Sequence, residues 1–111
     1  MARSQRFIFR NKQGRTRNNI NWDAISQDSA VIVTAAQWSL SGGTFGPHGR
    51  PVLGDPGQEP NVYVTNIGPH GTPGVEAGGV EFLLHTEANS PTDVMITVTV
   101  FDPIESFTIA G

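Results

Sequence analysis

Apolar and polar residues alternate in short runs along most of this chain, with the period of two that is typical of strands. The clearest run covers residues 94–101. One of its faces carries Val94, Ile96, Val98 and Val100, and the other carries Met95, Thr97, Thr99 and Phe101. Because both faces hold β-forming side chains, the pattern predicts a strand in the centre of a sheet.

Weaker runs predict further strands over residues 5–10, 31–40, 61–67, 80–86 and 104–110. In the second of these, Ile32, Trp38 and Leu40 share one parity, so we expect them to face the core. Tyr63 lies inside another predicted strand, and we expect it to pack in or against the core as well.

Glycine and proline separate the runs, with 13 and 8 residues respectively. Ten of the twenty residues in 41–60 are Gly or Pro, and a second such stretch covers 68–79. Both are predicted to be loops. A loop as long as the first is usually functional or mobile. Within the polar block of residues 18–29, residues 22–27 predict one helical turn that Asn21 or Asp23 could cap.

The residue balance sets the fold class. Val, Ile and Thr number 28, whereas Leu and Lys, which favour helices, number five. Six or seven short strands separated by turn signals predict an all-β fold, a small antiparallel Ig-like β-sandwich with two long Gly- and Pro-rich loops. A small barrel is the alternative. At 111 residues the chain has room for one core.

Residues 60–102 carry a more specific pattern. The stretch 62–69 reads Val-Tyr-Val-Thr-Asn-Ile-Gly-Pro, and Gly79-Val80-Glu81-Phe82-Leu83-Leu84 and the run from Asp93 to Phe101 follow it. This arrangement resembles the Ig-like CARDB class of bacterial adhesion-related modules, in which such a strand ends in a turn made by the Asn and the Gly. The resemblance implies a β-sandwich with a non-catalytic binding or assembly role, and it implies no active site.

Charge divides the chain into two parts. Residues 1–17 are net six positive, while residues 18–111 hold all ten acids against Arg50 alone, a net nine negative. We therefore predict a basic N-terminal arm over 1–17, which forms an edge strand, and a single sandwich domain over 18–111. The predicted interaction residues of the arm are Arg3, Arg6, Phe7, Phe9, Arg10, Lys12, Arg15 and Arg17. Such a segment suits an acidic partner or the acidic body of a neighbouring copy.

The three histidines suggest a metal site as one alternative. Gly46-Pro47-His48-Gly49 and Gly68-Pro69-His70-Gly71 repeat a phrase 22 positions apart, and His85 lies on a predicted strand. Neutral imidazoles that meet a carboxylate suit zinc or another divalent transition metal. The repeated phrase is equally typical of tight turns, because Pro fixes φ and Gly admits positive φ. We favour the turns and predict no cofactor.

Carbohydrate binding is the other alternative, with Trp22 as a ligand platform because it lies in a polar segment. Enzymatic signatures are lacking: the sequence holds no Cys, no GxSxG motif and no HExxH motif. We therefore expect a protein that is not an enzyme.

The sequence predicts a soluble protein and does not name its compartment, for which the cytoplasm and a virion are the candidates. The apolar run of residues 7–9 is too short for a signal-peptide core, and no stretch approaches the roughly twenty apolar residues of a membrane span. The leading hypothesis is a structural or interaction module that self-associates, or decorates a virion, fibre or shell, through its basic arm. Nucleic acid is a possible partner that no known reader motif supports.

Overall fold

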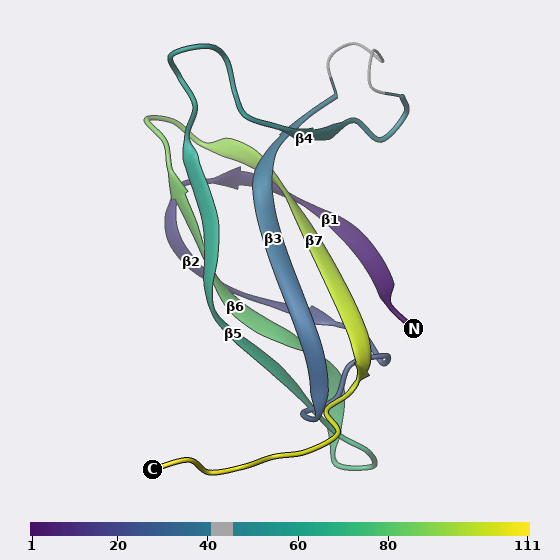
Figure 1. The fold of residues 1–111 in the computed structure, drawn as a ribbon. Helices are drawn as coiled ribbons and strands as arrows, with labels where there is room; N and C mark the ends of the chain where they lie inside the picture. The colour runs from purple at the N-terminus through teal and green to yellow at the C-terminus, as the bar shows by residue number, and fades with distance from the viewer. Residues whose placement is uncertain (41–45) are drawn as a thin grey trace.

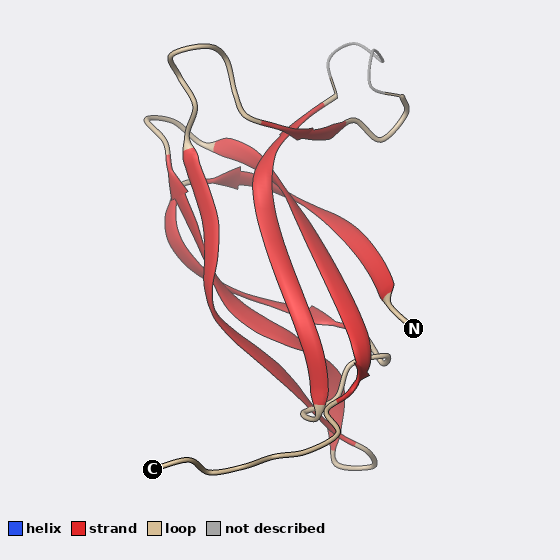
Figure 2. Cartoon of the chain, in the orientation of Figure 1, coloured by secondary structure: helices blue, strands red, loops and turns tan. Residues whose placement is uncertain are grey.

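The computed structural model describes residues 1–40 and 46–111, and within them it shows an all-β protein without helices (Figures 1 and 2). The strands are β1 (Arg3–Lys12), β2 (Gly14–Asn21), β3 (Ser29–Ser39), β4 (Arg50–Val52), β5 (Asn61–Thr72), β6 (Glu76–Glu87) and β7 (Thr92–Pro103). They form two antiparallel sheets with the orders β1-β7-β3-β4 and β2-β6-β5. The predicted sandwich class is confirmed.

The sheets are built by nested pairing. β1 pairs with β7 and β2 pairs with β6, so the first strands of the chain lie beside the last ones. The innermost hairpin joins β5 to β6. This wrapping resembles that of a jelly roll, which refines the Ig-like expectation at the level of strand order. Its consequence is that β1 and β2, which follow one another in sequence, are edge strands of opposite sheets.

The core lies between the central strands of the two sheets. β6 contributes Val80, Phe82 and Leu84, and β7 contributes the inward face that the sequence predicts; the residues of these two strands that are at most 1% exposed are Val80, Phe82, Leu84, Thr86, Val94, Ile96 and Val98. Phe7 and Phe9 of β1 are half-buried against this core, and the Phe9 ring stacks on Phe82 with centroids 6.2 Å apart. The predicted central position of the 94–101 strand is confirmed.

Residues 1–17 are part of both sheets. They supply all of β1 and the first half of β2, so the predicted boundary at residue 17 falls inside β2. β1 is hydrogen-bonded to β7 from Arg3 to Lys12, with a register shift between Phe9 and Lys12. Asn11 (φ 55°) and Gly14 (φ 75°) lie on either side of the tight connection between the sheets, and both have positive φ.

The predicted core face of β3 was wrong. Ile32 is 52% exposed and Leu40 is also exposed, whereas Val33 is buried. Apolar side chains occupy both faces of this strand, so the alternation alone could not tell inside from outside. Trp38 lies on the outer face of its sheet, half-buried beneath the turn of residues 46–49, and its Nε1 donates to the His48 carbonyl (2.8 Å). Tyr63 likewise faces outward and is 41% exposed.

The second predicted loop is largely strand. β5 continues through Pro69 to Thr72, and only residues 73–75 form the turn to β6. Pro69 is tolerated because β5 is an edge strand. The turn that the family resemblance implies at Asn66 and Gly68 is instead a bulge, with Asn66 at φ 55°. Gly71 allows a second irregularity, since a Cβ there would lie 2.7 Å from the Gly78 Cα.

Three other predicted elements differ from the structure or are described only in part. Residues 22–27 form turns without a helix, closed by the Ile25 N–H donating to the Trp22 carbonyl (3.0 Å). Residues 104–110 form no strand and are exposed. The predicted loop 41–60 contains a short strand, β4. Residues 41–45 of this loop lie outside the described residues. The described residues contain no helix long and apolar enough to cross a membrane.

The buried hydroxyl of Thr86 provides a test of how the core is packed. Its side chain is 0% exposed, and its hydroxyl has no hydrogen-bond partner among the described residues. A buried, unpaired hydroxyl destabilises a fold, so Thr86→Val should raise the free energy of unfolding by about 1 kcal/mol. Urea denaturation measures the change. Thr99→Val is the control, because the Thr99 hydroxyl bonds to Ser4 (2.8 Å) and its loss should not stabilise. An unchanged or lower stability of Thr86→Val would contradict the assignment.

Candidate functional site

The predicted basic residues lie on the two edge strands along one side of the sandwich, with Arg10 and Arg17 on the outer faces of opposite sheets. Arg3, Arg6, Arg10 and Lys12 are on β1, and Arg15 and Arg17 are on β2. The connection at residue 13 joins the two strands at one end, and at the other end the Arg3 guanidinium lies 5.5 Å from the Trp22 ring, just beyond β2. Lys12 Nζ also donates to Asn18 Oδ1 (3.1 Å), which links the strands. We call these six side chains and their two strands the basic edge.

Two cations of the basic edge are paired with carboxylates. Arg10 lies 3.5 Å from Asp93, and Arg17 lies 2.6 Å from Glu81. Both arginine side chains remain mostly exposed, at 66% and 79%. Arg6 Nε donates to the Thr97 hydroxyl (3.2 Å). The carboxylates therefore balance only part of the charge, and the edge keeps a positive surplus that faces solvent.

The backbone of the basic edge is also open. β1 and β2 each have one neighbour in their sheets, so the outward half of their N–H and C=O groups is not used in a ladder. At the core side of β1, Phe7 and Phe9 are only half-buried. An edge of this kind offers a partner strand hydrogen bonds, apolar area and cations at the same place.

Glu81 is the carboxylate most affected by this edge. Its hydrogen bond from Arg17 and the charge of that guanidinium lower its pKa, against a small opposing effect of desolvation. Arg17 contacts Glu81 through both Nε (3.2 Å) and a terminal nitrogen (2.6 Å). The pair fixes the Arg17 side chain on the outer face of β2 and β6.

The histidines do not converge. His48 lies on the exposed turn over the outer face of the first sheet. His70 belongs to the second sheet, where its ring nitrogens bond to Asn19 Oδ1 (2.7 Å) and the Ala77 carbonyl (2.9 Å). His85 stacks on Tyr63 with centroids 4.5 Å apart and bonds to the Thr65 hydroxyl (2.7 Å). In the described ranges, no three His, Asp or Glu side chains are placed to hold a metal ion.

Trp22 is not a free platform. It packs partly against the core, and the Arg3 guanidinium lies over its ring. The tryptophan that borders a hollow is Trp38, which sequence reasoning assigned to the core. One of its faces meets the Arg10 guanidinium, 5.3 Å from the ring centroid.

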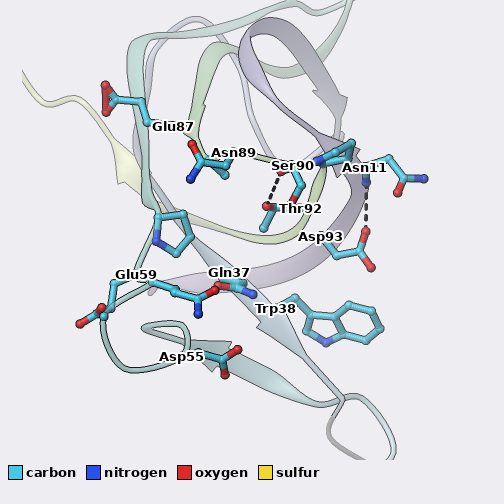
Figure 3. Close-up of a pocket in the computed structure, with 15 residues that line it drawn as sticks. Asn11, Gln37, Trp38, Asp55, Glu59, Glu87, Asn89, Ser90, Thr92 and Asp93 are labelled. Atoms are coloured by element: carbon cyan, nitrogen blue, oxygen red, sulfur yellow. Dashed lines mark hydrogen bonds between the residues drawn. The ribbon is translucent and has the colours of Figure 1, made fainter.

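The hollow beside Trp38 is a polar groove of about 680 Å³ at one end of the sandwich (Figure 3). Loop residues 55–60 form one wall, and residues 87–93 form the other. Its lining residues are mainly acidic, amide and hydroxyl residues, namely Asn11, Gln37, Asp55, Gln58, Glu59, Glu87, Asn89, Ser90, Thr92 and Asp93. Sequence reasoning missed this groove because its walls come from segments far apart in the chain.

The ion pair between Arg17 and Glu81 predicts a measurable change in the pKa of Glu81 when Arg17 is replaced. Arg17→Met should raise the pKa of Glu81 toward the ordinary glutamate range, because the guanidinium no longer favours the charged carboxylate. The pair stabilises the fold at pH values above the ordinary glutamate pKa, and this contribution is lost as the pH falls through the lower folded-state pKa. NMR titration of the side-chain carboxyl carbons measures the change. Arg15→Met, on the same strand but opposite His85, should leave Glu81 unchanged. Equal titrations in all three proteins would refute the pairing.

Comparison with known proteins identifies no relative. The chain matches no protein-family model, no curated protein and no solved structure. Any function assigned to it therefore depends on the surfaces described above.

Proposed function

We propose that this domain is a non-catalytic interaction module that self-associates, and so builds or decorates a larger protein assembly, through its basic edge. The observation that carries the proposal is the coincidence of charge and open backbone. Six of the seven Lys and Arg residues of the chain lie on two edge strands along one side of the sandwich.

Electrostatics favour a second copy as the partner. The rest of the chain is net nine negative, so the basic edge of one molecule is complementary to the body of another. Exposed ion pairs contribute little individually, about 0.2–1 kcal/mol. Their main effect here is to orient and accelerate the encounter, while backbone hydrogen bonds and the half-buried Phe7 and Phe9 supply the contact that lasts.

Arginines on an edge strand also have a simpler use, which is to prevent unwanted pairing. Two features support the interaction role over this one. Phe7 and Phe9 retain exposed apolar surface beside the charges, and a purely protective edge would gain nothing from it. The resemblance of residues 60–102 to adhesion-related modules also fits a binding or assembly role.

Charge reversal tests the proposal. We expect wild-type protein to associate in sedimentation velocity at low salt, and less so at high salt because exposed charges are screened. Arg6→Glu/Arg10→Glu should weaken the association about tenfold or more, as two attractions become repulsions. Arg50→Glu is the matched control, since Arg50 is the one basic residue outside the edge. Monomeric wild type, or an equal effect of Arg50→Glu, would reject the proposal.

The polar groove supports a second candidate function, carbohydrate binding. Sugars are recognised by carboxylates and amides that bond their hydroxyls and by an aromatic ring beside them. The groove combines Trp38 with Asp55, Glu59 and amide side chains on opposite walls (Figure 3).

A glycan array with two tryptophan variants examines this candidate. If the groove binds an oligosaccharide, Trp38→Ala should lose binding by about tenfold or more, while Trp22→Ala should retain it. Circular dichroism confirms that both variants are folded. Loss confined to Trp22→Ala would move the site to that residue, and no binding by wild type would remove the candidate.

A further inference from the structure

Residues 104–111 form an exposed segment whose apolar side chains the fold does not bury. After β7 ends, this segment runs away from the body of the protein (Figure 1). Phe107 is 87% exposed and Ile109 is 86% exposed. Exposed aromatic and β-branched side chains at alternate positions are typical of a strand whose partner is missing.

The segment cannot continue beside β7 as a further strand of the same sheet. β7 is already flanked by β1 and β3, so the sheet in which the segment would continue is complete at that point. The Ile104 N–H donates to the Asp28 carbonyl (2.9 Å), which directs the chain toward the start of β3 and away from β1. A strand forms only where a neighbour accepts its hydrogen bonds, so the strand pattern of 104–110 stays unfulfilled within one copy.

Among the edges of the described structure, β1 is the best acceptor. β4 has three residues, too few for a seven-residue partner. β2 has one apolar side chain, Ile20, and β5 is broken by two register shifts. β1 has ten residues, and Phe7 and Phe9 stand half-buried on its core side.

The two segments are complementary in spacing and charge. Phe107 and Ile109 are separated by two positions, as are Phe7 and Phe9. Residues 104–111 hold Glu105 and no basic residue, while β1 holds four basic residues and no acid.

We propose that residues 104–111 of one copy add as an antiparallel strand to β1 of a second copy, with Phe107 beside Phe9 and Ile109 beside Phe7. This inference rests on the proposed self-association through the basic edge and names the segment that occupies it. The register places Thr108 opposite Ile8, on the outer face of the sheet, and the apolar pairs over the core side of β1.

Cross-linking tests the register directly, because the chain has no native Cys. Opposite residues of antiparallel strands have Cα atoms about 4.5–5.5 Å apart, which a disulfide can bridge. Ile8→Cys protein mixed with Thr108→Cys protein should form a cross-linked dimer of the two variants under mild oxidation. Thr34→Cys, on the outer face of β3, is the matched control and should not cross-link to Thr108→Cys. Equal yields from the two mixtures would overturn the register and the choice of β1.

Sedimentation of apolar variants separates the inference from the proposed function. Phe107→Ser/Ile109→Ser should weaken self-association about tenfold or more and leave the fold intact, because both side chains are largely exposed in one copy. Leu53→Ser/Val75→Ser removes equally exposed apolar side chains, 84% and 85%, and should change nothing. If the segment variant associates like wild type while Arg6→Glu/Arg10→Glu does not, the inference fails and the basic edge stands. If wild type stays monomeric, both fail.

Discussion

The packing of β6 against β7 is the interaction on which the other parts of this structure depend. β6 is the middle strand of its sheet and β7 is one of the two interior strands of the other, and their inward side chains, from Val80 to Leu84 and from Val94 to Val98, are buried in one core. β3 adds Val33 to this core from the interior of its sheet, and β1 and β2 cover the core at one flank. β1 and β2 occupy the same flank because the chain crosses between the sheets at residue 13. The concentration of cations on one side follows from that crossing.

The chemistry of the surface follows from which strands are central. Outward positions of β6 and β7 include Glu81 and Asp93, and these carboxylates reach the arginines of the adjacent edge strands. The basic edge is thereby ordered by its own neighbours while much of its charge still faces solvent. An ordered cationic edge loses less conformational entropy on binding than a disordered arm would.

The sequence predicted the parts of the fold that depend on local pattern. β7 was predicted well because one of its faces is an unbroken series of β-branched residues. β3 was predicted as a strand with the wrong inward face, since Ile32 and Trp38 are as apolar as the residues that point to the core. Pro69 suggested a loop, and only the edge position of β5 explains why a strand accepts it.

The candidate functional surfaces were likewise predicted only in part from the sequence. A cluster of cations within 17 residues can be read from the sequence, because neighbours in the chain remain neighbours on adjacent strands. The groove beside Trp38 could not be read from it, because residues from position 11 to position 93 meet there only after folding. The stacking of His85 on Tyr63 depends likewise on the register between β5 and β6.

The nested strand order has a consequence for how the chain folds. The β5–β6 hairpin joins neighbours in sequence, whereas β1 must wait for β7, which begins 80 positions after β1 ends. Long-range pairings of this kind form slowly, so during synthesis the first strand is exposed before its partner exists. A run such as Phe7-Ile8-Phe9 would then be prone to aggregate, and the arginines on either side of it, Arg6 and Arg10, act as gatekeepers through charge repulsion. The same side chains would protect the nascent chain first and serve the folded protein afterwards.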